Sequence, residues 1–366
     1  MVRRKDQGVV PGEVTCFGTL RIHEWINMAK NIESFSFTKE SFLKDLVVVT
    51  GAPTSGKSML APIIGSLRRA ENFKMSILLE HLGTLNYLKK IPDDALTFLL
   101  RYTVDFMLYD NMIGRNLNFR FQDETSIWNS AEPQQYFDRL LSDRGEFVIE
   151  KIDKERPLLV LTLSDAFWHA KRWFEAFPFM KMIYIGRHPV DMIYSWNNHR
   201  YGGTVKKKRQ GQGARLTYGS ETYNSKINQV VLTRVNASIV PYYALQWANN
   251  YDDLTEMDRI IYMIECIRTY YAKTLTSLTD QERQQVLFLS FDETVTKTDA
   301  TVKKICSFLD TERTSYTSEV LKREKCPRIF SEDDRKNKLD KIKELATDQA
   351  FCLLMKMVDK YEQTRI

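Results

Sequence analysis

Short apolar runs alternate with segments of helical periodicity along most of the chain. Runs of strand length lie at 45–50, 76–80, 157–163, 181–186 and 285–290, and most of the segments between them repeat apolar residues at helical spacing. Strands that alternate with helices predict a mainly parallel sheet covered on both faces, with ligands at the carboxyl ends of the strands. We therefore expect a three-layer α/β fold.

The same pattern divides the chain into three parts. Residues 1–40 form an N-terminal extension, 41–330 contain the five predicted strands, and 331–366 form a C-terminal helical segment. Within the middle part, residues 93–145 have apolar positions at helical spacing and predict a helical insertion. Residues 257–278 predict a further helix.

The first strand leads into a glycine-rich turn with a complete phosphate-binding pattern. Leu46-Val-Val-Val-Thr50 is followed by Gly51-Ala-Pro-Thr-Ser-Gly-Lys-Ser58, which fits G-x-x-x-x-G-K-S/T, and Met59 to Arg69 can continue as a helix. Such a loop points backbone N–H groups at phosphate oxygens, the helix N-terminus adds partial positive charge, and Lys57 supplies a full charge. A glycine turn that binds nothing is the alternative, but strand, loop, lysine and helix together favour phosphate.

A second strand-to-helix turn carries an arginine and a serine. Met182-Ile-Tyr-Ile185 precedes Arg187-His-Pro-Val-Asp-Met-Ile-Tyr-Ser195, in which Ser195 lies eight residues after Arg187. This spacing is about two helical turns, so both side chains can contact one anion. Arg187 would give a charge-assisted fork and Ser195 a hydroxyl donor. Alternatively, Arg187 pairs with Asp191 at the start of the helix and binds no ligand.

Together the two turns resemble the sulfotransferases that use 3′-phosphoadenosine 5′-phosphosulfate (PAPS), of the carbohydrate and tyrosyl-protein type. Pro53-Thr-Ser-Gly-Lys-Ser58 is similar to the first loop of that family, and Arg187-x-Pro189-x-Asp191-x-x-x-Ser195 matches its second motif in full. Two later segments, Val286 to Glu293 and Val302 to Leu309, are similar to the family's late strand with its acidic turn and to the helix that follows. The resemblance implies a P-loop NTPase-like fold, PAPS as cofactor, adenosine 3′,5′-bisphosphate (PAP) as product, and no required metal.

The resemblance also implies roles for individual residues. The first loop would bind the 5′-phosphosulfate, and Arg187 with Ser195 would bind the 3′-phosphate. Many family members carry Lys or Arg where this chain has Thr54, so Lys57 becomes the cation expected at the bridging oxygen. The expected cofactor ligands are Pro53, Thr54, Ser55, Gly56, Lys57, Ser58, Met59, Arg187 and Ser195.

Glu80 is the candidate general base. In several carbohydrate and tyrosyl members of the family, a glutamate just after the helix that follows the loop has this role, and Glu80 is the best positional match. Ser76-Ile-Leu-Leu-Glu80 reads as the second strand, which would bring Glu80 beside the first loop. A helix-capping or surface carboxylate is the alternative. His81 is the reserve base, so the expected catalytic residues are Glu80, Lys57 and His81.

Asp165 is also compatible with a second class of enzyme. It follows the strand Leu158-Leu-Val-Leu-Thr-Leu163 much as a Walker-B aspartate would, and it could hold Mg²⁺ together with Ser58. The chain would then be an Mg-ATP-dependent kinase of a small molecule. A protein that binds a nucleotide without catalysis is a third hypothesis.

Composition adds weaker constraints. The 366 residues are 43% hydrophobic and 27% charged, as is usual for a folded protein, and the net charge of +6 suits an anionic ligand but is too small to indicate nucleic acid. The five cysteines are odd in number and contain no C-x-x-C pair, which predicts free thiols. Neither a signal peptide nor an apolar run of membrane-spanning length is evident, so we expect a cytoplasmic protein.

The acceptor is the least constrained part of the prediction. Tyr201 to Ser220 is glycine-rich around Lys206-Lys-Lys-Arg209 and predicts either a basic lid over the site or a solvated loop. Tyr242, Tyr243 and Trp247 form either an aromatic platform for a sugar ring or the buried face of a helix. We expect a hydroxyl acceptor on a glycan or glycolipid.

Overall fold

The computed structural model describes residues 36–142, 144–204, 206–207, 216–217, 230–236 and 238–364. Most of the predicted N-terminal extension lies outside these ranges. So does most of the basic segment 201–220, of which Lys206–Lys207 and Leu216–Thr217 form two short antiparallel strands, β5 and β6.

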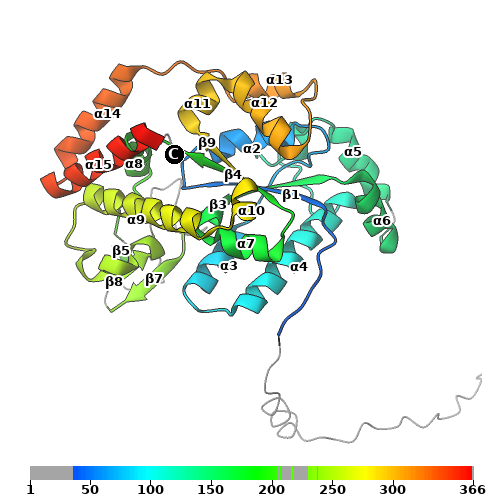
Figure 1. Cartoon of the computed structure of the whole chain (residues 1–366), viewed down its shortest axis with the longest axis horizontal. Coiled ribbons are helices and arrows are strands. Elements are labelled where there is room, and N and C mark those ends of the chain that lie inside the picture. Colours follow the sequence, from blue (N-terminus) through cyan, green and yellow to red (C-terminus); the bar gives the residue numbers. More distant parts are fainter. Residues whose placement is uncertain are drawn as a thin grey trace, which may run out of the picture. The chain divides into compact units, whose positions relative to one another are not determined.

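A five-stranded parallel sheet forms the centre of the fold (Figure 1). In spatial order its strands are β2 (Lys74–Met75), β3 (Leu158–Ser164), β1 (Asp45–Gly51), β4 (Lys181–Gly186) and β9 (Val286–Ser290). The apolar run of β1 is buried on both faces, as a central parallel strand requires. Because β1 pairs with both β3 and β4, the turns that follow these three strands lie at the same edge of the sheet.

Helices cover both faces of this sheet and create two hydrophobic cores. Val47 and Val49 of β1 face one core, and Leu46 and Val48 face the other, as the alternation along a strand dictates. The predicted three-layer α/β, P-loop NTPase-like fold with a parallel central sheet is therefore confirmed. The first core is closed by α2 (Lys57–Gly65), α11 (Phe291–Thr296), α12 (Thr298–Leu309) and α13 (Thr317–Arg323).

The other core is larger and includes the C-terminal helices. Its helices are α3 (Ile77–Tyr87), α4 (Asp93–Met112), α6 (Glu146–Glu155), α7 (Ala170–Ala176), α8 (Pro189–Asn198), α9 (Glu256–Ser277), α14 (Glu332–Leu345) and α15 (Asp348–Thr364). Shorter elements are η1 (Ile127–Asn129), α5 (Pro133–Asp138), η2 (Arg139–Leu141), η3 (Ala166–His169), the hairpin β7 (Leu232–Val235) and β8 (Ser238–Pro241), η4 (Tyr242–Asn250) and α10 (Asp280–Gln284). Among the described residues, none of the helices combines the length and apolar character needed to cross a membrane.

The predicted strands at 45–50, 157–163, 181–186 and 285–290 are confirmed to within one residue, and 257–278 is confirmed as α9. The predicted strand at 76–80 is wrong. Only Lys74–Met75 are extended, and Ser76 caps α3 by accepting a hydrogen bond from the Leu79 N–H. Leu79 and Leu82 are buried while Leu78 is 57% exposed, which is helical spacing.

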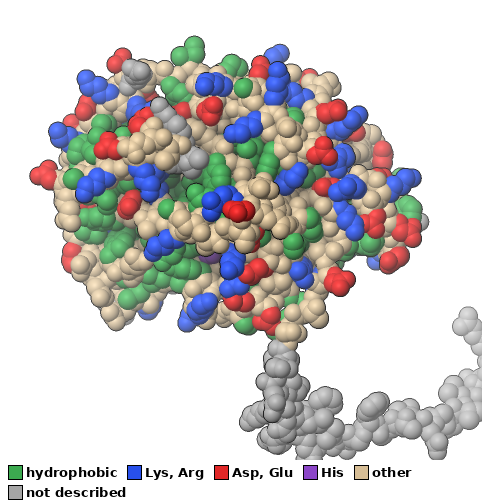
Figure 2. Space-filling view, in the orientation of Figure 1, with side chains coloured by type: hydrophobic (Ala, Val, Ile, Leu, Met, Phe, Trp, Pro, Cys, Tyr) green, Lys and Arg blue, Asp and Glu red, His purple; other side chains and the backbone are tan. Residues whose placement is uncertain are grey.

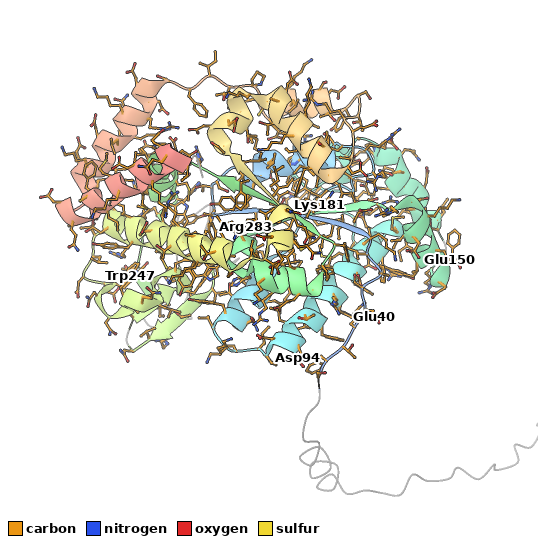
Figure 3. All side chains as sticks on the ribbon, in the orientation of Figure 1. Glu40, Asp94, Glu150, Lys181, Trp247 and Arg283 are labelled. Atoms are coloured by element: carbon orange, nitrogen blue, oxygen red, sulfur yellow. The ribbon has the colours of Figure 1, made fainter. Side chains whose placement is uncertain are left out.

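Charged side chains of both signs are interspersed over the face shown in Figure 2, which agrees with the small net charge. Some charged side chains stabilise helix ends. Asp93 and Asp94 occupy the first turn of α4, where carboxylates complement the partial positive charge of the helix N-terminus (Figure 3 labels Asp94).

A buried ion pair joins the segment after α4 to the sheet. The Arg139 guanidinium donates to Glu71 through two nitrogens, at 2.7 and 2.8 Å, and both side chains are less than a tenth exposed. The Tyr136 hydroxyl donates to the same carboxylate and accepts from the Asn72 N–H. Glu71 lies just before β2, so this network fixes residues 133–141 against the sheet.

We expect Arg139→Ala to lower the free energy of unfolding by about 3–5 kcal/mol, because it leaves Glu71 buried without its cation. Arg120→Ala is the matched control, since Arg120 pairs with Asp123 at the surface with 73% and 43% of the two side chains exposed. That change should cost about 0–1 kcal/mol. Denaturant unfolding measures both losses, and equal losses would contradict a structural role for the buried pair.

Candidate functional site

The glycine-rich turn between β1 and α2 adopts an unusual backbone. Gly51 and Gly56 have φ angles of 151° and 111°, and Thr54 has φ of 67°. A Cβ on Gly51 would lie 2.4 Å from the Ile185 carbonyl oxygen, so no other residue fits there. A β-branched residue with left-handed φ is strained, and such strain is characteristic of binding loops held by their surroundings.

The polar groups of this turn are suited to an anion. The Thr54 and Ser55 hydroxyls are buried and have no hydrogen-bond partner among the described residues. Lys57 is only 7% exposed, and its ammonium donates to the carbonyl oxygen of Ala52, within the same turn, at 2.9 Å. Buried hydroxyls normally have partners, so anion oxygens would complete this set.

The remaining predicted ligands of the first turn differ in position. Ser58 is exposed at the start of α2, and Pro53 is partly buried in the turn. The Met59 side chain lies in the core, and its N–H donates to the Gly56 carbonyl at 3.2 Å. We therefore do not include Met59 among the phosphate ligands.

The second turn is bonded directly to the first. Arg187 Nη1 donates to the Thr54 carbonyl oxygen at 2.8 Å, and Trp196 Nε1 donates to that of Pro53 at 2.9 Å. Ser195 lies on α8, partly buried, immediately before Trp196. The structure thus brings together the two turns that the sequence singled out.

The alternative partner of Arg187 is engaged elsewhere. Asp191 accepts from Arg335 Nε and Nη2, at 3.0 and 2.8 Å, and from Lys338 Nζ at 2.9 Å. Arg187 forms no ion pair with it, and its Nε is buried without a hydrogen-bond partner among the described residues. Burial lowers the pKa of Arg187, as expected for a cation that has no direct counter-charge.

Phe291 and two arginines near the second turn are site residues that sequence reasoning missed. The Phe291 ring packs so closely on the first turn that a Cβ on Gly56 would lie 2.4 Å from it. The guanidinium carbons of Arg187 and Arg328 lie 4.6 and 5.8 Å from the centre of this ring. Arg335 joins Asp191 to Asp292, the residue after Phe291. The positive charges of Arg328 and Arg335 both lower the pKa of Arg187. An aromatic residue directly after a strand was the signal available for Phe291.

Glu80 reaches the site from the first turn of α3 rather than from a strand end. Its carboxylate accepts from the Ser164 N–H, at the end of β3, at 2.5 Å. Burial raises the pKa of Glu80 to about 7, although the Ser164 N–H and the charge of Lys57 oppose the shift. A carboxylate with this pKa can accept a proton near neutral pH. His81, the next residue, is partly buried on the same helical turn.

Asp165 is surrounded by tyrosines. Its two oxygens accept from the hydroxyls of Tyr242 at 3.0 Å, of Tyr271 at 2.9 Å, and of Tyr243. Burial raises the pKa of Asp165, and the hydrogen bonds from Tyr243 and Tyr271 oppose the rise. Both oxygens accept hydrogen bonds from tyrosines, so the contacts of Asp165 explain its position without a Walker-B role.

The same contacts distinguish the two roles expected for Tyr242 and Tyr243, an aromatic platform for a sugar or a buried face. Tyr242 and Tyr243 are 4% and 3% exposed, so they form a buried face and not a sugar platform. Trp247, which Figure 3 labels, is partly buried. Its ring stacks on that of Tyr251, with ring centres 5.4 Å apart. In the part of the chain that the structure describes, no group of three or more His, Cys, Asp or Glu side chains could hold a metal ion.

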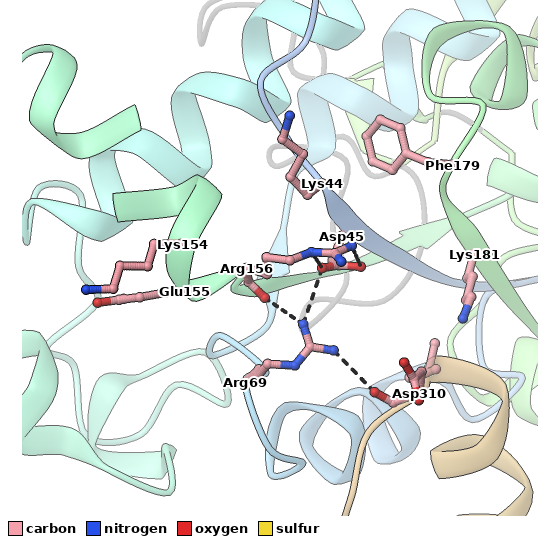
Figure 4. Close-up of a pocket in the computed structure, with 10 residues that line it drawn as sticks. Lys44, Asp45, Arg69, Lys154, Glu155, Arg156, Phe179, Lys181 and Asp310 are labelled. Carbon is pink, nitrogen blue, oxygen red and sulfur yellow. Dashed lines mark hydrogen bonds and ion pairs between the residues drawn. The ribbon is translucent and has the colours of Figure 1, made fainter. Parts of the chain in front are cut away.

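A separate charged cavity of about 600 Å³ lies at the opposite edge of the sheet, where β1 and β4 begin (Figure 4). Arg69 and Arg156 both pair with Asp45, at 3.3 and 3.1 Å, and Arg69 also donates to the Asp310 carbonyl oxygen at 3.2 Å. These charges stabilise a junction between helix ends and β1, remote from the two turns.

Comparison with known proteins identifies the family. The family model described as the sulfotransferase domain matches residues 44–350. The chain therefore belongs to the sulfotransferase family, as the two turns predicted, and it is a transferase enzyme that uses a sulfuryl donor. A search of curated proteins finds no match.

Solved structures give only distant similarity. The chain is 9% identical to the sulfotransferase domain of the Synechococcus PCC 7002 olefin synthase, with 90% of this chain and 98% of that chain covered and a TM-score of 0.42. It is 14% identical to the sulfotransferase domain of the curacin biosynthetic pathway (75% and 77% covered, TM-score 0.34) and 15% identical to a sulfotransferase from Alicyclobacillus acidocaldarius (86% and 96%, TM-score 0.34). These similarities are too weak to carry any conclusion about the site.

Proposed function

We propose that this sulfotransferase takes its sulfuryl group from PAPS and transfers it to a hydroxyl acceptor. The observation that carries the proposal is the pair of anion-suited turns on adjacent strands, joined by the Arg187 and Trp196 hydrogen bonds. A nucleotide with phosphates at both its 5′ and 3′ positions has one anion for each turn. A nucleotide such as ADP would leave Arg187 without an anion.

The residues divide between the two ends of the nucleotide. Pro53, Thr54, Ser55, Gly56, Lys57 and Ser58 surround the 5′ end, where the buried Thr54 and Ser55 hydroxyls can donate. Arg187 and Ser195 bind the 3′-phosphate, and the nearby Arg328 adds positive potential. Because a guanidinium has five N–H donors, Arg187 can donate to a phosphate while it keeps its Nη1 bond to the Thr54 carbonyl oxygen.

The chemistry is assigned to Glu80 and Lys57. When bound, PAPS supplies a sulfuryl group whose bond to the 5′-phosphate oxygen breaks as its bond to the acceptor oxygen forms. Glu80 accepts the proton of the acceptor hydroxyl, for which its pKa of about 7 is suited. Lys57 stabilises the negative charge that develops on the departing phosphate oxygen, and the buried setting strengthens this interaction. His81 remains the reserve base.

A glycan or glycolipid remains the acceptor class that we propose to test first. The burial of Tyr242 and Tyr243 removes the aromatic pair that would have supported a sugar ring. The predicted basic lid at Lys206 to Arg209 belongs to a segment whose side chains lie outside the described residues. The acceptor class therefore rests on the positional match of Glu80 to the carbohydrate and tyrosyl members of the family.

The 3′-phosphate contact predicts selectivity between nucleotides. The protein should bind PAP more tightly than ADP, and Arg187→Ala should reduce PAP affinity about ten- to hundredfold, because a charge-assisted hydrogen bond is worth about 1.5–3 kcal/mol. Arg200→Ala is the control, since Arg200 lies just past α8 with 61% of its side chain exposed. Calorimetry that finds equal affinity for PAP and ADP would overturn the proposal.

The role of Glu80 predicts both a rate and a pH profile. Glu80→Gln keeps the shape but cannot accept a proton, so turnover should fall about a hundred- to ten-thousandfold with little change in PAP affinity. In the unaltered enzyme kcat/KM should decrease about tenfold per pH unit below about pH 7, because the base becomes protonated there.

The decrease of kcat/KM below about pH 7 should be absent from the residual activity of Glu80→Gln. Glu146 is an exposed carboxylate in the first turn of α6, so Glu146→Gln should change neither the turnover nor the pH profile of kcat/KM. An active Glu80→Gln enzyme with an unaltered pH profile would exclude Glu80 and make His81→Asn the next variant to measure.

A further inference from the structure

A second cavity, of about 290 Å³, lies between the edge strand β9, α9 and α15. Four aromatic side chains line it: Phe167, Tyr184, Tyr271 and Phe288. Small-molecule sites are mostly apolar and aromatic with a few placed polar groups, and the volume is near the lower end of their range. A cavity of roughly 150 Å³ already accommodates benzene, so this one has room for one or two fused rings.

The aromatic walls are held in place by one another. Tyr271 meets Phe167 and Tyr184 edge to face, with ring centres 5.5 and 5.3 Å apart and interplanar angles of 82° and 90°. Tyr184 and Phe288 are register partners on adjacent strands, with ring centres 5.7 Å apart. The rings therefore form a preformed aromatic wall in which Phe288 is the most exposed ring and Phe167, Tyr184 and Tyr271 are buried behind the surface.

The charged side chains that line the cavity are both cationic. Arg268 comes from α9 and Lys360 from α15, and no acidic side chain is among the described residues that line it. Arg268 opposes the rise in the pKa of Tyr184 that burial causes, so its charge lies within electrostatic range of that hydroxyl. Aromatic walls beside two cations complement a ring that carries a negative group.

We propose that this cavity binds a small planar aromatic anion, with its ring packed against the cavity-facing sides of Tyr184, Tyr271 and Phe288 and its anionic group at Lys360, where Arg268 adds positive potential. The site is distinct from the two nucleotide turns, and the proposal does not depend on the identity of the sulfuryl donor. It does contact the machinery around the first turn. Tyr271 has its ring in the cavity wall and its hydroxyl on Asp165, whose charge in turn acts on Lys57.

A matched pair of probes tests the charge requirement. Calorimetry of the full chain with 2-naphthoate should show one site, and 2-naphthamide, which has the same shape without the charge, should bind about tenfold more weakly. Lys360→Gln should weaken naphthoate about threefold, as loss of one exposed cation would. Lys356→Gln, exposed one turn earlier on α15 and not part of the lining, should leave the affinity unchanged.

A second variant tests the location. Ala272 lines the cavity and is exposed on α9, so Ala272→Trp should cover the opening and abolish naphthoate binding without altering the melting temperature. Saturating PAP should leave naphthoate bound. Equal affinity for the two probes, absence of naphthoate binding, or displacement by PAP together with full binding to Ala272→Trp would each overturn the proposal.

Discussion

The packing of the Phe291 ring against Gly56 is the contact on which the candidate site depends. A Cβ on Gly56 would lie 2.4 Å from the ring, so the first turn can approach it only with glycine at this position. The same ring lies 4.6 Å from the Arg187 guanidinium. One side chain at the start of α11, directly after β9, therefore contacts both turns, and the hydrogen bond from Arg187 to Thr54 joins the turns directly.

Arg335 stabilises this arrangement from a distant part of the chain. It joins Asp191, in the first turn of α8, to Asp292, in the first turn of α11. Helix α8 begins directly after the turn that contains Arg187, and α11 begins with Phe291 directly after β9. Helix α14, the second-last helix, thus joins the helix after the second turn to the helix that begins with Phe291, although it supplies no residue of either phosphate motif.

Two carboxylates near Lys57 lie in different environments, Glu80 partly buried and Asp165 buried. Glu80 receives one backbone N–H, and burial dominates, so its pKa rises to about 7. Asp165 receives three tyrosine hydroxyls and is tied to η4 and α9. Such a difference in environment can give neighbouring carboxylates different pKa values. Both still stabilise the charged form of Lys57 against the effect of burial.

The sequence was informative wherever the determinant is local. The first turn combines a buried strand, two glycines and a lysine within a few residues, and the second has its arginine, proline and serine at fixed spacing, so both could be placed and paired with β1 and β4. The strand predicted from Ser76 to Glu80 is wrong because a short apolar run fits a strand or a helix equally, whereas Ser76 caps a helix there. Arg335 and the tyrosines on Asp165 lie beyond such reasoning, since their partners are far away in the chain and meet only through packing.

A crystal structure of the complex with PAP tests the central claim most directly. We expect the 5′-phosphate beside Lys57 and the N-terminus of α2, and the 3′-phosphate within hydrogen-bond distance of Arg187 and Ser195, with Phe291 still packed on Gly56. A complex in which the first turn holds one phosphate while the other points away from Arg187 would contradict the account, because the second turn would then have no part in binding the nucleotide.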